Sequence, residues 1–285
     1  MRLLLRGCAA LFVLAWLAVA GNVSYVVLHK PNYEGLVRLS DDGKSRTTIA
    51  RGVGGYGLAV DERGDYIVAD ASSLLRVTAL GVVSNIAAAP SGSQWLSVAV
   101  DSVGNYIIAD NRQHAVWRVS QDGQIVDRVA NYPVRFSSEM EDVGVIVEGS
   151  GDYLLMEDNS GAAHFWRISP AGSVTSIPLH GDKMTSDSFI VGDGAGAYFV
   201  ASYRDRAIFR VTPAGDVAKF ADVGSQRFAG LARNPETGEL VTSVGLDPSV
   251  LWRISANGSP VTQFASAGYV TAIIAGSGEH AASAR

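Results

Sequence analysis

Four ionisable residues, spaced roughly forty positions apart, each end a short apolar segment: His29, Asp70, Asp110 and Glu157. Carboxylates and an imidazole that converge can bind a divalent cation such as Ca²⁺ or Mg²⁺, or can separate one another's pKa values for acid–base chemistry. Asp70, Asp110 and Glu157 are therefore candidate metal ligands, and His29, Asp110 and Glu157 are candidate catalytic groups. The alternative is that each carboxylate caps its own turn by accepting hydrogen bonds from backbone N–H groups.

Three aromatic residues fall in segments that the sequence predicts to be loops: Tyr56, Trp95 and Tyr203. Exposed rings of this kind can stack on a ligand. Together with Asp70, Asp110 and Glu157 they form the predicted ligand-binding set, to which residues 131 to 142 are expected to add contacts. Cys8 is the only cysteine and lies near the N-terminus, so the chain after residue 20 cannot use cysteine catalysis or thiolate metal ligands.

The elements that must position these residues occur six times. Each copy reads apolar, Arg, apolar, Ser or Thr, and is followed by Gly after two further residues. The alternation has a period of two, which is typical of a strand, and the glycine indicates a tight turn, expected to be a two-residue hairpin at Asp42-Gly43 and Asp122-Gly123. The six arginines are Arg38, Arg76, Arg118, Arg167, Arg210 and Arg253.

Each copy belongs to a larger unit of four short strands, clearest in the unit that starts near residue 57. Repeated units of four antiparallel strands are the blades of a β-propeller. Residues 271 to 275 look like a first strand with nothing after it, whereas residues 25 to 28, 36 to 40 and 47 to 50 look like second, third and fourth strands with nothing before them. The chain is therefore predicted to be an all-β, six-bladed propeller whose ring is closed by one C-terminal strand joining three N-terminal strands.

The sequence Ala59-Val60-Asp61, followed by Gly64-Asp65-Tyr66, Ala69-Asp70 and the Arg strand, resembles the NHL repeat, and the resemblance covers nearly all of the chain after residue 20. It is more distantly similar to the SMP-30/gluconolactonase and virginiamycin B lyase propellers. Those enzymes imply a metal-dependent hydrolase or lyase that acts on a lactone or ester. Their motifs are not intact here: the lyase histidine would lie fourteen residues before Asp70 or Asp110, where this chain has Tyr56 and Leu96.

Residues 1 to 20 have the pattern of a signal peptide, with Arg2 and Arg6, an apolar run from Gly7 to Leu17, and Ala18-Val19-Ala20. The predicted organisation is a signal peptide (1–20) and a six-bladed NHL-like propeller (21–285), exported to the periplasm or secreted. The alternative is a retained membrane anchor, because the apolar run can be extended to Leu28. If the leader is cleaved, no membrane span remains.

The net charge is −5 and there is no basic run, so nucleic acid is not an expected partner. The leading hypothesis is an exported monomer that binds a small molecule, glycan or protein at the mouth of the central channel, on the face with the long loops. The alternative is the metal-dependent hydrolase or lyase, in which a cation would polarise a carbonyl group.

Overall fold

The computed structural model describes residues 24–29, 34–133, 143–159, 162–185, 189–202, 204–224, 228–245 and 249–276. Every element in these residues is a β-strand, which confirms the predicted all-β class. The same residues contain no helix with the length and apolar character needed to cross a bilayer.

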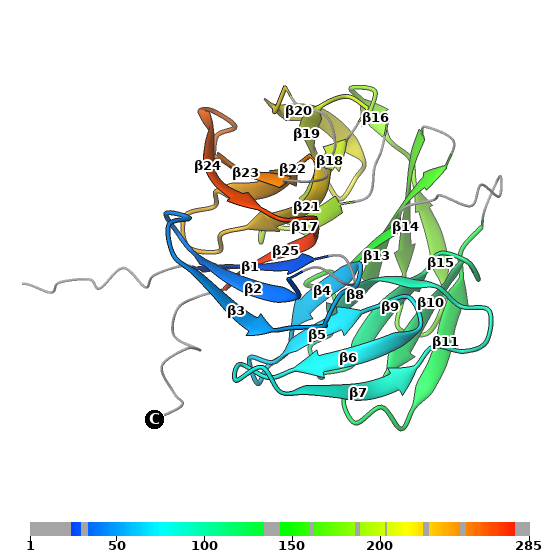
Figure 1. The fold of residues 1–285 in the computed structure, drawn as a ribbon. Helices are drawn as coiled ribbons and strands as arrows, with labels where there is room; N and C mark the ends of the chain where they lie inside the picture. The colour runs from blue at the N-terminus through cyan, green and yellow to red at the C-terminus, as the bar shows by residue number, and fades with distance from the viewer. Residues whose placement is uncertain are drawn as a thin grey trace, which may run out of the picture.

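The strands form six antiparallel sheets arranged in a ring, so the predicted six-bladed propeller is confirmed (Figure 1). From the centre outward, the blades are β25 (Val270–Gly276), β1 (Ser24–His29), β2 (Leu36–Ser40) and β3 (Arg46–Ala50); β4 (Gly57–Val60), β5 (Tyr66–Ala69), β6 (Ser73–Val77) and β7 (Val83–Ala88); β8 (Trp95–Val100), β9 (Tyr106–Asp110), β10 (Ala115–Val119) and β11 (Val126–Asn131); β12 (Val143–Val147), β13 (Tyr153–Asn159), β14 (Ala162–Ile168) and β15 (Val174–Ile177); β17 (Phe189–Gly192), β18 (Tyr198–Ser202), β19 (Ala207–Val211) and β20 (Asp216–Asp222); and β21 (Phe228–Arg233), β22 (Leu240–Val244), β23 (Ser249–Ile254) and β24 (Val261–Ala267).

The ring is closed in the first blade, where the C-terminal strand β25 pairs with β1. Tyr25 lies opposite Ala275 and Val27 lies opposite Ile273, so residues 271 to 275 join residues 25 to 28 as predicted. Figure 1 shows the red β25 beside the blue β1. Closure of this kind removes the unpaired edges that the two chain ends would otherwise expose.

The fifth blade has one element that the repeat pattern does not predict. β16 (His180–Gly181) runs parallel to β20 and pairs with it on its outer edge, where His180 lies opposite Asp216. The chain that leaves the fourth blade therefore follows the outside of the fifth blade before it turns inward. This additional strand lies in the connection between β15 of the fourth blade and β17 of the fifth.

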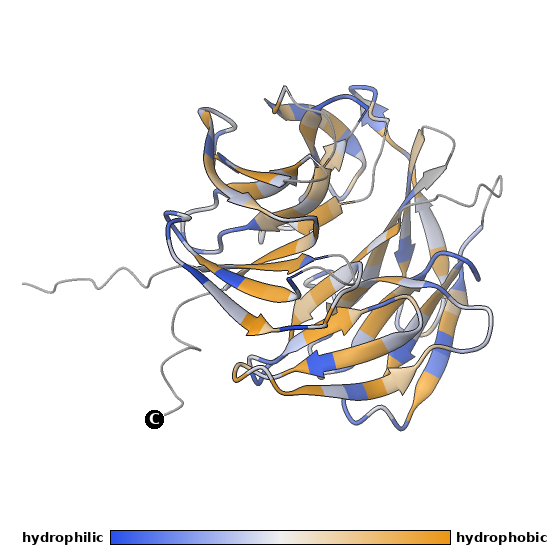
Figure 2. Cartoon of the chain, in the orientation of Figure 1, coloured by the Kyte–Doolittle hydropathy of each residue, from blue (hydrophilic) through white to orange (hydrophobic). Residues whose placement is uncertain are grey.

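The hydrophobic core lies between adjacent blades. Every residue of β9 is buried, since this strand has a neighbouring blade on both sides. One cluster between the second and third blades contains Leu74, Trp95, Tyr106 and Trp117. Figure 2 shows long apolar stretches in the strands and hydrophilic residues at many turns. Burial of one large apolar side chain contributes roughly 1.5–3 kcal/mol, so these interfaces stabilise the ring.

The six repeated glycines are required by both conformation and packing. All have positive φ, from 70° at Gly43 to 93° at Gly215. A Cβ on Gly123 would lie 1.9 Å from the carbonyl oxygen of Ile86, in the outer strand of the preceding blade. No other residue type combines this φ with this close approach.

The turns themselves are longer than predicted. The N–H of Ser40 donates to the carbonyl of Ser45, and that of Thr78 donates to the carbonyl of Val82. Three or four residues therefore separate the paired positions, and the expectation of two-residue hairpins is wrong. A β-turn followed by a left-handed glycine is the standard solution for loops of this length.

The repeated arginines join neighbouring blades at the face with the short turns. Arg76 donates a hydrogen bond of 2.7 Å to the hydroxyl of Tyr106 in the next blade. Arg167 binds both oxygens of Glu148, at 2.6 and 2.9 Å, and also contacts the hydroxyl of Tyr198 at 3.4 Å. Burial alone would raise the pKa of Glu148, but the hydrogen bonds from Arg167 and Tyr198 hold that pKa below its ordinary value. Arg76, Arg167 and Arg210 thus form ion pairs with the carboxylates that follow the first strands of their own blades, Asp61, Glu148 and Asp193.

Candidate functional site

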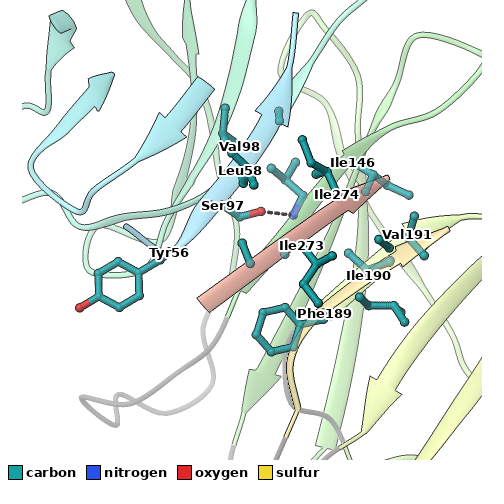
Figure 3. A pocket seen from close by; sticks show the side chains of 18 of the residues that line it. Tyr56, Leu58, Ser97, Val98, Ile146, Phe189, Ile190, Val191, Ile273 and Ile274 are labelled. Atoms are coloured by element: carbon teal, nitrogen blue, oxygen red, sulfur yellow. Dashed lines mark hydrogen bonds between the residues drawn. The ribbon is translucent and has the colours of Figure 1, made fainter. Parts of the chain in front are cut away.

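The innermost strands of the six blades enclose a central channel with a cavity of about 310 Å³. β4, β8, β12, β17, β21 and β25 all contribute to its lining (Figure 3). This volume is at the lower end of the roughly 300–1,000 Å³ that is typical of small-molecule pockets.

Small residues let the inner strands approach one another closely. A Cβ on Gly57 would lie 2.9 Å from the Cα of Ser97, and one on Gly230 would lie 3.0 Å from the backbone nitrogen of Ile273. The hydroxyl of Ser97 accepts a 3.0 Å hydrogen bond from the N–H of Val145, which ties β8 to β12. The narrow channel is thus a consequence of Gly and Ser at inner-strand positions.

The side chains around the channel are mostly aliphatic. Ile146, Ile190 and Ile274 are only partly buried although they lie near the centre of the molecule. Figure 3 shows them around the cavity, with Tyr56 and Phe189 toward one end. Tyr56 precedes β4 and is 41% exposed. The structure therefore places Tyr56, a predicted ligand contact, at an opening of the cavity on the long-loop face.

Arg233 lines the opposite end of the channel. It is the last residue of β21 and the one charged side chain among the described residues that line the cavity. The same place is occupied by valine in three other blades, at Val60, Val100 and Val147, and by Gly192 and Ala275 in the remaining two. Arg233 is not among the predicted site residues, although a charged residue at this position of the repeat is a signal that identifies it.

Asp110 and Asp70 hold loops at the ends of their strands. The Oδ1 of Asp110 accepts hydrogen bonds from the N–H groups of Gln94, Arg112 and Gln113, at 2.9 to 3.1 Å. Its Oδ2 accepts one from the indole of Trp117 at 3.0 Å. Asp70 accepts from the N–H groups of Ser72 and Ser73. These are the hydrogen bonds that the turn-capping alternative predicts.

His29 is completely buried at the end of β1. Its Nδ1 donates to the carbonyl of Gly35 at 2.8 Å, and its Nε2 lies 3.6 Å from Oε2 of Glu34. Burial lowers the pKa of His29, and the positive charge of Arg46 lowers it further, although the hydrogen bond to Gly35 opposes both effects. The imidazole is therefore neutral at pH 7.

Glu157 is also buried, in β13, where it lies opposite His164 on β14. None of His29, Asp70, Asp110 and Glu157 lines the central cavity. The reason is topological: they end second strands, and the first strands lie between them and the channel axis. In the described part of the chain, no three His, Cys, Asp or Glu side chains are grouped closely enough to hold a metal ion.

Trp95 is not in a loop, so its predicted position is wrong. It is the first residue of β8 and has no exposed surface, because it packs in the core between the second and third blades. In this structure the indole offers no face to a ligand. Tyr203 and most of the 131 to 142 loop, namely residues 134–142, lie outside the described residues.

No protein-family model and no curated protein sequence matches the chain. Solved structures do match it. A chain of a nidogen/laminin complex aligns with a TM-score of 0.70 at 10% identity, over 90% of this chain and 99% of that one. Virginiamycin B lyase from Staphylococcus aureus gives 0.56 at 18% identity, over 85% and 74%. A gluconolactonase from Xanthomonas campestris gives 0.59 at 16% identity, over 76% and 77%.

These similarities are at the level of the fold. They confirm the predicted resemblance to the lyase and gluconolactonase propellers in architecture. One fold carries many functions, so the chemistry of this chain has to be argued from its own residues.

Proposed function

We propose that this chain is an exported propeller that binds a small, largely apolar molecule in its central channel. The observation that carries the proposal is the cavity of about 310 Å³, whose aliphatic lining stays partly exposed at the centre of the fold. An apolar ligand that covers this lining removes apolar surface from contact with water, which is favourable by roughly 25 cal/mol per Å². The opening beside Tyr56 offers an aromatic contact for the same ligand.

The binding proposal can be tested with N-phenyl-1-naphthylamine, a neutral fluorescent probe whose emission rises in an apolar site. The wild-type chain is expected to bind it with a stoichiometry of one. Ala59→Phe adds a ring to the channel lining and should abolish binding without lowering the melting temperature by more than a few degrees. Ala171→Phe places the same ring on an exposed turn and should leave binding intact. Equal binding by all three proteins would defeat the proposal.

The export proposal is supported by the basic, apolar and small-residue pattern of residues 1 to 20. N-terminal sequencing of the protein recovered from cells that express the full gene tests it. The expected mature chain begins at Gly21. A chain that still begins at Met1 and remains with the membrane fraction would support the anchor alternative instead.

A further inference from the structure

The charge distribution along the channel is one-sided. The described lining is aliphatic or aromatic over most of its length, and Arg233 supplies the one formal charge, at the end away from Tyr56. A cavity with mostly apolar side chains and a single cation at one end is complementary to an amphipathic anion. The anionic group of the ligand contacts the cation, and its apolar part contacts the apolar side chains.

The guanidinium of Arg233 differs from those of the repeated arginines. Arg76, Arg167 and Arg210 each pair with a carboxylate or a hydroxyl in the described structure. Arg233 has neither a hydrogen bond nor an ion pair with any described residue. The carboxylate of Asp193, which ends the inner strand of the adjacent blade, is already bound to Arg210 at 2.6 Å.

The guanidinium of Arg233 lies beside two glycines. Cβ atoms added to Gly194 and Gly238 would lie 3.5 and 3.4 Å from its Nη1 and Nη2. The two nitrogens therefore lie next to turns of the fifth and sixth blades at positions where glycine leaves the guanidinium without a neighbouring side chain. Both glycines have positive φ, 76° and 75°, so the turns favour glycine there for conformational reasons as well.

We propose that the ligand of the channel is a small amphipathic carboxylate, whose carboxylate is bound by Arg233 and whose apolar chain extends toward Tyr56 and Phe189. This inference rests on the proposed function, because it names the ligand class of the same cavity. A planar guanidinium can bind a carboxylate through two parallel hydrogen bonds. The partial burial of Arg233 reduces competition from water and strengthens that pairing.

Displacement of N-phenyl-1-naphthylamine by decanoate and by 1-decanol tests the inference, because the two compounds share an apolar chain and differ in charge at neutral pH. Below their micelle concentrations, decanoate should displace the probe from the wild type at a concentration about tenfold lower than decanol does, as expected for a hydrogen bond to a charged group. Arg233→Gln should remove this preference and leave displacement by decanol unchanged.

Two further variants complete the design. Arg112→Gln removes an equal charge from an exposed position whose side chain does not line the channel, and it should keep the preference for decanoate. Arg233→Lys keeps the positive charge but lacks the planar guanidinium, and it should keep a reduced preference for decanoate over decanol. Melting curves of each variant establish that it is folded.

Decanoate and decanol of equal potency on the wild type would overturn the carboxylate inference and leave the apolar-ligand function standing. The wild-type comparison decides this even if Arg233→Gln does not fold. An Arg233→Gln protein that folds and still prefers decanoate would also overturn it. Failure of both compounds and of the probe to bind would overturn the inference together with the proposed function.

Discussion

The blade junctions and the central channel use the same repeated strands in opposite ways. At the junctions, polar groups are paired: Arg167 binds Glu148 in its own blade and Tyr198 in the next one, and Arg76 binds Tyr106 in the next blade. In the channel, apolar side chains remain partly exposed, and the single charge, on Arg233, has no described partner. The repeated arginines are kept at the blade junctions. In the channel lining, Arg233 departs from the apolar residues of the repeat. This difference separates the residues that stabilise the fold from those available to a ligand.

The largest expected effect comes from two aromatic residues that the sequence placed in the same class. Trp95→Ala should lower the free energy of unfolding by about 3–5 kcal/mol, because it removes a completely buried indole from the core. Tyr56→Ala should cost less than about 0.5 kcal/mol, because that ring is 41% exposed, and it should weaken probe binding several-fold. Urea unfolding and probe titration measure both. Similar losses of stability in the two variants would break the distinction between junction and channel.

The turn glycines give a matched pair that isolates blade packing from backbone conformation. Gly123 and Gly52 have φ of 75° and 70°, but a Cβ would lie 1.9 Å from Ile86 O at the first and would have no atom within 4 Å at the second. Gly123→Ala should therefore destabilise by at least about 2 kcal/mol, against about 1 kcal/mol for Gly52→Ala. Equal losses would mean that the contact between blades at this turn adds nothing.

The junction arginines themselves can be ranked by their partners and burial. Arg167 is 32% exposed and binds both oxygens of Glu148, whereas Arg210 is 43% exposed and its partner Asp193 also accepts hydrogen bonds from the N–H groups of Ala195 and Ala197. Arg167→Met should cost about 2 kcal/mol, because it leaves Glu148 buried without its partner. Arg210→Met should cost less than about 1 kcal/mol. Chemical denaturation checks the order, and the opposite order would contradict the structural role given to the Arg167 network.

The smallest effect concerns His29, which burial keeps from being protonated. Its pKa is lower in the folded state than the ordinary 6.5, so the unfolded chain binds a proton more readily below about pH 6.5. Stability should therefore fall as the pH drops from 7 toward the folded pKa, by at most about 1.4 kcal/mol per pH unit from this group. His29→Gln should show a shallower loss of stability in urea titrations over that range. An identical slope would show that His29 does not titrate on unfolding.

Much of the fold could be predicted from the sequence because each repeated segment has a local pattern that determines its backbone conformation. Alternation around each Arg requires a strand, and the glycine after it requires a left-handed residue. Ring closure followed from the unmatched strands at the two ends, and the register of Tyr25 opposite Ala275 agrees with it.

The site was harder to predict because a shared position in the repeat does not by itself bring side chains to the channel. Asp110 and His29 end second strands, which lie behind the inner strands, so their shared position in the repeat did not bring them to the cavity. The residues before Trp95 are Gly, Ser and Gln, which are typical of a loop, yet the indole packs in the core. Arg233 could have been predicted as the one charged residue among the six first-strand positions equivalent to Val60.

The most direct test of the separation between junction and channel compares melting temperature and N-phenyl-1-naphthylamine binding in two variants, Arg167→Met and Ala59→Phe. Arg167→Met is expected to melt at a lower temperature while it still binds the probe at temperatures where it is folded. Ala59→Phe is expected to melt close to the wild type and to bind no probe. If the junction variant loses the probe while folded, or if the channel variant retains it, the division of the ring into a stabilising periphery and a binding centre is contradicted.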